Sequence, residues 1–442
     1  MHIDLLIHAS WVIPVEPEGT VLRDHAVAVN GRQIVAVLPS AEARQQYRPR
    51  AEVHLSGQAL LPGFINAHTH AAMTLFRGLA DDRPLMEWLE QHIWPAEQRW
   101  VDPGFVRDGT RHAIAEMLRS GTTCFSDMYF YPGEIAETAA ECGIRALVGL
   151  IVIEFPTQWA RDAHEYFSKG LRVHDALRGH PLVRTAFAPH APYTVSDPSL
   201  ERVRVLAEEL DLPIHMHLHE TANEVEGALA ANGERPLARL QRLGLLSPRF
   251  IAVHMTQLQD AELALLAGHG ASVAHCPHSN LKLASGNCPV HQLMAAGVNV
   301  ALGTDGAASN NSLDMLAELR SAALLAKAVA GDAAALPAAR ALSMATLHGA
   351  RALGLDALTG SLLPGKEADL IAVRLDTIET EPLYDPISQL VYATGREAIS
   401  EVWVAGRQVL RDRELLTVDC EAVLRASRAW QVRIGAGDAH GG

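Results

Sequence analysis

Short apolar segments alternate with helical stretches along the middle of the chain, between roughly residues 60 and 355. The apolar segments have the length and composition of buried strands, and apolar positions between several of them recur at helical spacing. The expected strands are Leu60–Ala67, Thr122–Asp127, Arg145–Leu150, Val183–Ala188, Ile214–His219, Phe250–His254, Ser272–His275 and Val298–Thr304. The expected helices include Val106–Leu118, Leu200–Leu210, Glu224–Leu240 and Asp260–Ala267. Eight strand–helix units over about 250–300 residues predict an α/β fold, a closed (β/α)8 barrel of the TIM type.

Both ends of the chain are rich in strand patterns. Ala26–Val29 and Gln33–Val37 flank Asn30-Gly31, a pair that readily takes the positive φ angles of a tight hairpin turn. Ala368–Val373 and Glu401–Leu410 alternate or run apolar around glycine turns. We therefore expect residues 1–58 and 358–442 to build a small composite β-sandwich domain, and residues 59–357 to form the barrel.

Composition excludes several classes of protein. The chain has 442 residues, 48% hydrophobic and 20% charged, which is typical of a globular protein. A net charge of −14 argues against a nucleic-acid or anionic-membrane surface. Five cysteines without a CxxC spacing argue against a disulfide framework. No signal peptide and no run of about 18 apolar residues is evident, so we expect a cytoplasmic protein. A homo-oligomer is left open.

Polar residues stand where the barrel strands end, which is where the active site of such a barrel lies. His68 and His70 close the first strand, and alternate residues of a strand point the same way. His254 ends the sixth strand, and Asp305 follows the eighth. Each has an ordinary alternative, such as a hydrogen-bonded core histidine or a helix N-cap for Asp305. Together they predict a metal site with one position open for water.

The fifth strand carries three histidines, His215, His217 and His219, on one side. Periodicity cannot choose the metal ligand among them, and the other two could support a ligating ring from behind. Glu220 follows where the strand should give way to a loop, a suitable place for a proton shuttle, although a solvated loop carboxylate is the plainer alternative.

One metal ion is favoured over two. A bridged pair needs an extra anionic ligand within about 4 Å of both ions. The fourth strand ends Ala-Phe-Ala-Pro-His190 and offers neither a lysine nor an acid. We expect one divalent ion per subunit, zinc in the first place, with iron or manganese also suited to such ligands.

Several segments resemble the amidohydrolase superfamily, and within it the methylthioadenosine/S-adenosylhomocysteine deaminase branch. The resemblance spans nearly the whole chain. The matching segments are Leu61-Pro-Gly-Phe-Ile-Asn-Ala-His-Thr-His70, Met73-Thr-Leu-Phe-Arg-Gly78, Glu87-Trp-Leu89, His217-Leu-His-Glu-Thr221, His275-Cys-Pro-His-Ser-Asn280, Leu302-Gly-Thr-Asp-Gly-Ala-Ala-Ser-Asn310 and Pro364-Gly-Lys-Glu-Ala-Asp-Leu370.

The resemblance implies a role for each matching residue. Metal binding is implied for His68, His70, His217 and Asp305, His217 being chosen because the family's ligand lies three residues before the catalytic glutamate. Substrate contacts are implied for Glu97 with the ribose hydroxyls, Trp88 with the purine face, His190 with a purine ring nitrogen, and Ser309 with the pocket wall. The ordinary alternatives are a helix-surface acid for Glu97 and core packing for Trp88.

One departure from the branch bears on the substrate. The branch can place two arginines at the amino-acid end of S-adenosylhomocysteine. Arg161 matches one of them, but the other position, near Val148, is apolar. This departure favours methylthioadenosine or a similarly truncated adenosine over S-adenosylhomocysteine.

The mechanism expected from these roles is hydrolytic deamination at C6 of adenine. Asp305 would take the proton of the attacking water, His254 would hold and polarise it, and Glu220 would protonate N1. Two alternatives remain at this point. One is deamination or dechlorination of guanine, cytosine or an s-triazine, for which a ribose-binding Glu97 would be pointless. The other is a catalytically dead barrel with an assembly or regulatory role, against which the complete ligand set argues.

Overall fold

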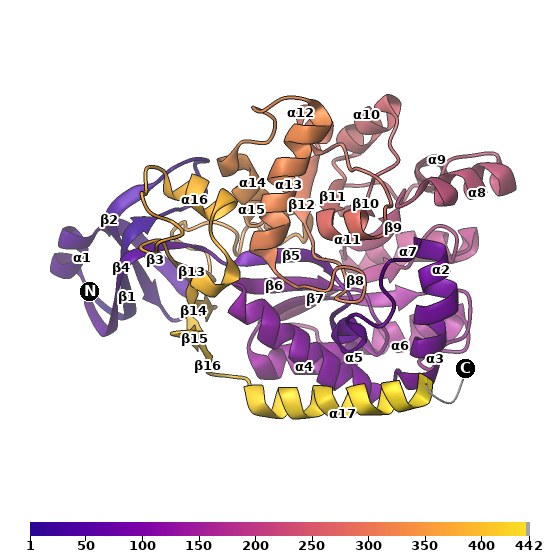
Figure 1. Cartoon of the computed structure of the whole chain (residues 1–442), viewed down its shortest axis with the longest axis horizontal. Coiled ribbons are helices and arrows are strands. Elements are labelled where there is room, and N and C mark those ends of the chain that lie inside the picture. Colours follow the sequence, from indigo (N-terminus) through magenta and orange to yellow (C-terminus); the bar gives the residue numbers. More distant parts are fainter. Residues whose placement is uncertain (439–442) are drawn as a thin grey trace.

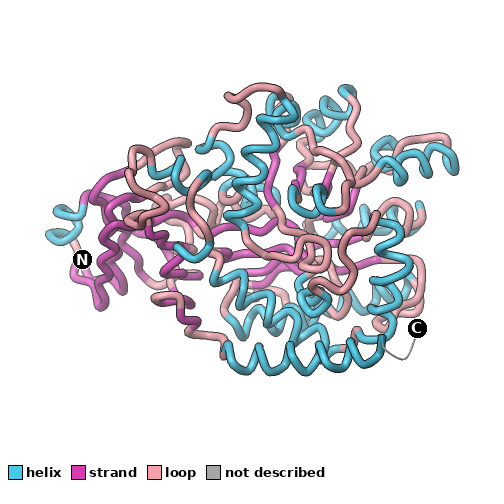
Figure 2. The backbone as a smooth tube through the Cα atoms, viewed as in Figure 1, coloured by secondary structure: helices cyan, strands magenta, loops and turns pink. Residues whose placement is uncertain are grey.

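The computed structural model describes residues 1–438. The strands of these residues form two eight-stranded sheets. One is a parallel sheet in which every strand neighbours the next strand of the chain, with helices on its outside (Figures 1 and 2). Its strands are β5 (Phe64–Thr69), β6 (Thr122–Asp127), β7 (Arg145–Val152), β8 (Val183–Pro189), β9 (Ile214–Leu218), β10 (Phe250–His254), β11 (Ser272–His275) and β12 (Asn299–Leu302). The predicted fold class, a (β/α)8 barrel with a β domain built from both chain ends, is confirmed.

Helices cover the barrel strands. The helices along the barrel part of the chain are α4 (Pro103–Arg119), α5 (Pro132–Cys142), α6 (Ala163–Ala176), α7 (Asp197–Leu210), α8 (Ala222–Asn232), α9 (Pro236–Arg242), α10 (Asp260–His269), α11 (Pro277–Lys282), α12 (Val290–Ala295), α13 (Met315–Ala330), α14 (Ala338–Met344) and α15 (Leu347–Ala352). The last helix, α17 (Cys420–Asp438), lies along α4 at the edge of the molecule (Figure 1).

Side chains close the seam between the first and last barrel strands. Asn66 of β5 donates through Nδ2 to Thr304 Oγ1 (2.7 Å), and its Oδ1 accepts from the Thr304 amide (2.9 Å). Beside this pair, the Asp305 amide donates to the carbonyl of His68 (3.0 Å). Gly303 lies against His68 so closely that a Cβ there would stand 2.8 Å from the His68 nitrogen. The seam therefore fixes the two ends of the chain segment that carries the predicted metal ligands.

The second sheet collects strands from both ends of the chain, in the order β16-β15-β14-β13-β4-β1-β2-β3. Its strands are β1 (His2–Val12), β2 (Leu22–Asn30), β3 (Gln33–Pro39), β4 (Arg48–Pro62), β13 (Leu370–Arg374), β14 (Ile399–Val404), β15 (Arg407–Arg411) and β16 (Glu414–Leu415). One face buries an apolar cluster that includes Ile7, Val29, Leu370 and Trp403, so residues from both termini share one core. The domain division at residues 58 and 357 stays a prediction.

Two predicted elements were too long. Leu60–Ala67 is split between the two sheets, because β4 ends at Pro62 and β5 begins at Phe64 after Gly63, which packs against Thr123. Glu224–Leu240 is two helices, α8 and α9, because the chain turns at Gly233 with φ 72° before Pro236 starts the next helix. Glu401–Leu410 forms strands around a glycine turn as predicted, a hairpin of β14 and β15 that turns at Gly406 with φ 78°. The strands Thr122–Asp127, Phe250–His254 and Ser272–His275 are confirmed with the predicted bounds.

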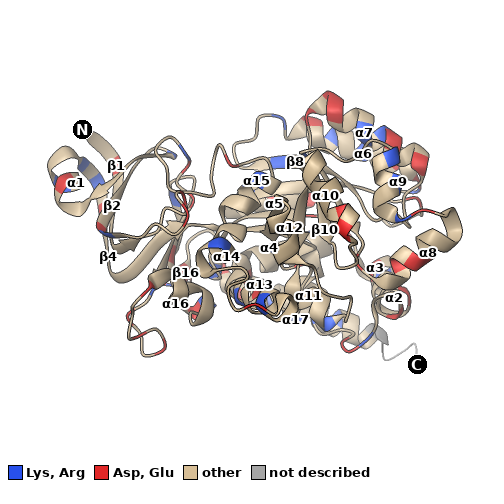
Figure 3. Ribbon diagram, turned by 90° about the horizontal axis from the view of Figure 1, so that it is seen from above, with Lys and Arg blue, Asp and Glu red and all other residues tan. Residues whose placement is uncertain are grey.

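The outer surface carries mixed charge. Arg side chains lie among Asp and Glu over the outer helix α7, for example (Figure 3). Among the helices within residues 1–438, none combines the length and the apolar character that crossing a bilayer requires.

A buried ion-pair network joins the barrel to the β domain. Arg145, at the start of β7, has 3% of its side chain exposed and pairs through Nε with Asp369 Oδ2 (2.9 Å) and through Nη2 with Glu367 Oε2 (2.6 Å). Arg32 of the β domain pairs with the same Glu367 at 2.9 Å. Asp369 is fully buried and also accepts from the amide of Ala405 (2.7 Å). The buried charge of Arg145 in the barrel is therefore neutralised by carboxylates of the β domain, and their charge is neutralised in turn.

We expect Arg145→Ala to lower the free energy of unfolding by about 3–5 kcal/mol, because it leaves the carboxylate of Asp369 buried without a cation. Chemical denaturation of the holoenzyme measures the loss. Arg178→Ala is the matched control, since Arg178 pairs only with the exposed Asp175 (2.7 Å) and should cost about 0–1 kcal/mol. A loss below about 1 kcal/mol for Arg145→Ala would contradict the structural role assigned to the network.

Candidate metal centre and active site

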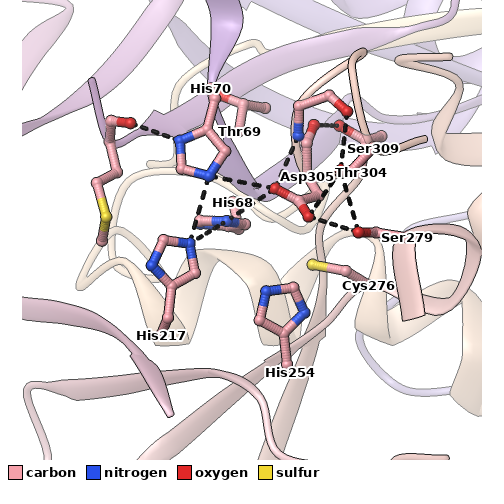
Figure 4. Close-up of polar contacts among 12 residues, drawn as sticks. His68, Thr69, His70, His217, His254, Cys276, Ser279, Thr304, Asp305 and Ser309 are labelled. Atoms are coloured by element: carbon pink, nitrogen blue, oxygen red, sulfur yellow. Dashed lines mark hydrogen bonds and ion pairs between the residues drawn. The ribbon is translucent and has the colours of Figure 1, made fainter. Parts of the chain in front are cut away.

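Four donor atoms from three barrel strands converge on one point at the carboxyl ends of the strands (Figure 4). His217 Nε2 lies 3.2 Å from His68 Nε2 and 3.3 Å from His70 Nε2. Asp305 Oδ1 lies 3.2 Å from His68 Nε2 and 3.3 Å from His70 Nε2. The structure thus brings together the four residues that the sequence predicted as metal ligands.

Hydrogen bonds at the far side of each ring fix which nitrogen faces this point. His70 Nδ1 donates to the carbonyl of Met128 (2.6 Å), and His217 Nδ1 donates to the carbonyl of His190 (2.8 Å). A neutral imidazole that donates through Nδ1 presents a lone pair at Nε2. His68 Nδ1 contacts His215 Nε2 (3.0 Å), and His215 Nδ1 contacts Ser126 Oγ (3.3 Å), a relay compatible with the same tautomer. These contacts therefore turn the Nε2 lone pairs of His68, His70 and His217 towards the shared point.

The carboxylate of Asp305 is oriented by its own partners. Ser279 Oγ and Ser309 Oγ donate to Oδ2 at 2.6 and 3.0 Å, and the Gly306 amide donates to Oδ1 at 2.8 Å. Oδ2 is occupied by two hydroxyls, so Oδ1 is the oxygen turned to the histidines. Ser309 reaches the cavity wall as predicted, and its hydroxyl also serves Asp305.

The donor set fits a divalent cation of the size of zinc. A tetrahedral zinc with ligands at about 2.0–2.1 Å separates neighbouring donor atoms by about 3.3 Å. The four donor contacts given above, at 3.2–3.3 Å, match this spacing. Converging lone pairs repel each other, and a cation between them removes the repulsion while satisfying all four donors.

Electrostatics assigns a proton to this cluster when no cation is bound. Burial lowers the pKa of His68 to about 4, so His68 is neutral at physiological pH. Burial alone would also lower the pKa of His70, but the neighbouring carboxylate of Asp305 outweighs it and raises that pKa to about 9. A metal ion therefore replaces one proton, which His70 holds.

In the structure, the three histidines of the fifth barrel strand have three different roles. His217 is a candidate ligand, and His215 stands behind His68, as described above. His219 turns away from the site, where Nε2 accepts from the Leu237 amide (3.1 Å) and Nδ1 lies 3.9 Å from Glu262. Burial lowers the pKa of His219 to about 4.

Glu220 and His254 stand beside the donor set. His254 Nδ1 contacts Asn280 Oδ1 (2.8 Å), which makes Nδ1 the donor and turns Nε2 towards Glu220 Oε1 at 3.7 Å. Glu220 has 6% of its surface exposed, and burial raises the pKa of its carboxyl. A buried carboxyl with a raised pKa can hold a proton near neutral pH and deliver it to a bound ligand.

Glu224 holds the backbone that carries Glu220. Its carboxylate accepts from the amides of His219 (2.9 Å) and Glu220 (2.7 Å), while its own amide donates to Thr221 Oγ1 (3.3 Å). Thr221 thus caps the start of α8, and the Glu224 carboxylate binds the two amides that precede the cap. It fixes where the β9 strand gives way to the helix and therefore where the Glu220 side chain begins.

Three residues at the ends of barrel strands have backbones in the left-handed region. The φ angles are 51° for His219, 75° for His254 and 61° for Asp305. Such angles are uncommon for residues with a Cβ, and they occur at sites where the surrounding fold enforces them. At these bends His254 and Asp305 face the cavity, whereas His219 turns away from it.

A cavity of about 380 Å³ opens above the donor atoms, a volume within the usual range for small-ligand sites. Its lining is largely aromatic and aliphatic. The lining includes Trp88, Trp94, Tyr129, Phe130, Ile151, Ile153, Phe155 and Tyr193, with Glu97, His190, Glu220 and Ser309 among the polar residues. A flat, partly apolar ligand with a few hydrogen-bonding groups suits such walls.

Trp88 and Glu97 both line the cavity although they are nine residues apart. In an uninterrupted α-helix such residues point in opposite directions, about 180° apart. Here the π-helical turn Leu89–Ile93 separates α2 (Leu85–Trp88) from α3 (Trp94–Trp100) and changes this angle. Burial raises the pKa of Glu97 to about 7, and the nearby Tyr129 hydroxyl partly opposes this rise.

His190 also faces the cavity, as predicted. Its Nδ1 contacts Thr194 Oγ1 (3.0 Å), and burial lowers its pKa to about 3, so the ring is neutral. Because Nδ1 is engaged by the Thr194 hydroxyl, Nε2 is the ring nitrogen of His190 that can contact a ligand.

Arg161 is the one predicted contact that the structure does not bring to the cavity. Its side chain is 84% exposed and pairs with Glu165 at 3.1 Å. Val148 is buried within β7. Among the described residues, the lining of this cavity contains no Lys or Arg.

Sequence reasoning missed the residues that orient the predicted ones. Ser279, Asn280, Met128 and Glu224 contact site residues through the hydrogen bonds given above. Ser279 and Asn280 belong to the segment His275-Cys-Pro-His-Ser-Asn280, whose polar residues directly follow a barrel strand. That position was the available signal, whereas the Met128 contact uses a backbone carbonyl and leaves no trace in residue type.

Comparison with known proteins gives a line of evidence that is independent of the site geometry. The model of the amidohydrolase family matches residues 59–409. The chain is 49% identical to the 5-methylthioadenosine/S-adenosylhomocysteine deaminase of Teredinibacter turnerae over 98% of each chain. It is 49% identical to the protein of the same name from Saccharophagus degradans, over 99% of this chain and 98% of that one. A crystal structure of an adenosine deaminase from Xanthomonas campestris with bound zinc is 56% identical, with a TM-score of 0.98 over 98% of this chain and 99% of that one.

Loading the metal-free protein with zinc at pH about 6 should release about one proton per ion, because His70 must lose its proton to bind. At this pH a zinc-bound water with a pKa of about 7 stays largely protonated and adds little. Calorimetric titration of chelator-treated protein in two buffers of different ionisation enthalpy measures the number. Uptake of zinc without proton release would contradict the charge state assigned to the cluster.

Proposed function

Since this chain belongs to the amidohydrolase family, we propose that it is a metal-dependent hydrolase that deaminates an adenosine-type nucleoside. The reaction replaces the 6-amino group of the purine by oxygen and yields an inosine-type product and ammonia. The observation that carries the proposal is a single cavity beside the metal donors whose lining includes both Glu220 and Glu97.

A divalent cation, zinc in the first place, fits His68, His70, His217 and Asp305, and when bound it lowers the pKa of water from 15.7 towards about 7. The protein's own residues then divide the work at the reacting carbon. Asp305 accepts the proton of the attacking water, and its two serine partners hold it in place for that transfer. His254, fixed by Asn280, directs its Nε2 to the nucleophile.

Glu220 handles the protons on the purine. Its raised pKa lets it carry a proton to N1, which makes C6 a better electrophile as water adds. Asp305 then passes the water proton to the amino group, the C6–N bond breaks and ammonia leaves, while the C6 hydroxyl gives its proton to Glu220 as the carbonyl forms. Each proton transfer of this kind contributes about 10²–10⁴-fold to the rate.

Glu97 and Trp88 recognise the nucleoside. A carboxylate can accept from two vicinal hydroxyls at once, which suits Glu97 to the ribose, and the indole of Trp88 offers a flat apolar face to the purine. His190 can donate to a purine ring nitrogen. A free base such as guanine or cytosine, or an s-triazine, would leave Glu97 buried without its partner.

The lining of the cavity favours a short apolar substituent on the nucleoside. Ile151, Ile153 and Phe155 belong to its lining, and no cation of the described lining can pair with an amino-acid carboxylate. Burying that carboxylate unpaired is costly. We therefore propose methylthioadenosine as a better substrate than S-adenosylhomocysteine.

An ammonia-release screen tests the function. Zinc-loaded enzyme should turn over methylthioadenosine with the highest kcat/KM, followed by adenosine and then S-adenosylhomocysteine, because only the last brings a charged end to an apolar wall. Turnover of guanine or an s-triazine without any activity on adenosine compounds would replace the proposal. Absence of turnover together with absence of about one bound metal ion would support a catalytically dead barrel.

The variant Glu97→Gln tests nucleoside recognition in the same screen. Charge-assisted hydrogen bonds contribute about 1.5–3 kcal/mol each, so kcat/KM for methylthioadenosine should fall about ten- to hundredfold. The kcat/KM for 2′,3′-dideoxyadenosine should change little, since it lacks both hydroxyls. Equal losses on the two substrates would remove the ribose from the assignment of Glu97.

Glu220→Gln should lower kcat by about 10²–10⁴-fold while one equivalent of metal stays bound, because the amide cannot deliver the proton that N1 requires. Steady-state kinetics and metal analysis of the same sample check both parts. Glu226→Gln, at an exposed position of α8, is the matched control and should leave kcat unchanged. A near-wild-type kcat in Glu220→Gln would reject Glu220 as the proton donor.

A further inference from the structure

A second group of metal-ligating side chains lies on the β domain, on the sheet that does not carry the barrel site. His8 of β1 and His54 of β4 are direct neighbours in the parallel pairing of these strands. Glu52 lies two residues before His54 on the same strand and so points to the same face. The three side chains therefore lie side by side on one face of the sheet.

The donor atoms of these residues face one another. His8 Nε2 lies 2.9 Å from Glu52 Oε1, and His54 Nε2 lies 3.5 Å from the same oxygen. The two imidazole rings are stacked with centroids 4.9 Å apart and planes 9° from parallel. The three ligand atoms lie within 4.8 Å of one another, close enough to share one ion.

His8 is the buried and pre-oriented member of the group. Its side chain is 6% exposed, its Nδ1 contacts Ser40 Oγ at 2.9 Å, and its Nε2 is buried without a hydrogen bond of acceptable direction. Leu6, Ala26 and Ala43 of the small core beneath α1 (Ser40–Gln46) lie on the same face of the sheet. This packing holds the ring so that Nε2 points at the carboxylate.

The other two ligands leave one side open. The side chains of Glu52 and His54 are 39% and 59% exposed, so solvent can complete the coordination of an ion. Two imidazole nitrogens and one carboxylate oxygen form a donor set used for divalent transition metals, with water in the remaining position.

We propose that His8, Glu52 and His54 form a second, peripheral binding site for a divalent transition-metal cation such as zinc. The site is independent of the barrel ligands and of the deaminase activity. Arg44 of α1 acts on His8 as a nearby positive charge and the site has three ligands, so it binds more weakly than the barrel site, which has four. The competing explanation is a protonated His8 paired with Glu52, with no metal involved.

Metal counting on the untagged, full-length holoenzyme separates the two explanations. The protein is dialysed to equilibrium against a series of free zinc concentrations, and bound zinc is measured by mass spectrometry. The wild type should bind about two equivalents, with the second lost first as zinc falls. His54→Asn should bind about one equivalent. Loss of an outer-sphere partner typically weakens metal binding by at least about tenfold, and loss of a direct ligand should weaken the second site by no less.

His25→Asn is the matched control, since His25 is a half-buried histidine of the same sheet whose ring contacts the carbonyl of Arg23 (2.7 Å) and lies outside the proposed ligand group. It should keep both equivalents. Glu52→Gln should lose the second equivalent as His54→Asn does, and a zinc-soaked crystal should give an anomalous peak between the two Nε2 atoms. A wild type that never exceeds one equivalent, or a His54→Asn variant that binds as much zinc as the wild type, overturns the proposal.

Discussion

Three imidazole nitrogens and one carboxylate oxygen, each about one tetrahedral edge from its neighbours, repel one another unless positive charge stands between them. In this protein that charge is either the proton on His70 or a cation, and the rest of the site is arranged around this condition. Carbonyls of Met128 and His190 fix the ring tautomers, and the hydroxyls of Ser279 and Ser309 fix the carboxylate. The donors thus stay in place whichever charge they hold, which is the meaning of a preorganised centre.

The same fold places two carboxyl groups in one cavity with different tasks. Asp305 is held ionised by its histidine neighbours, which outweigh the effect of burial and keep its pKa well below the ordinary value. Glu220 lacks such neighbours at hydrogen-bonding distance, and burial raises its pKa. One group is therefore suited to accept a proton and the other to donate one, although they face the same small volume.

Much of this arrangement could be predicted from residue order, because the barrel turns position along the chain into position in space. Once the strands are known, His68, His70, His254 and Asp305 must meet at one end of the barrel. The choice among His215, His217 and His219 could not be made from periodicity, since all three share a side of the strand. It depends on φ 51° at His219, which turns that ring towards Leu237. The break at Gly63 and the position of Arg161 likewise depend on tertiary packing that local patterns do not encode.

The seam of the barrel has a consequence for how the protein matures. The bonds of Asn66 with Thr304, and of the His68 carbonyl with the Asp305 amide, tie the first barrel strand to the last. During synthesis, His68 and His70 emerge from the ribosome long before residue 305, and until the eighth strand docks they lack both the aspartate and the backbone that fixes them. Metal acquisition is therefore a late event, coupled to completion of the barrel. A chain interrupted before residue 305 would carry the first histidines but no centre able to retain the ion.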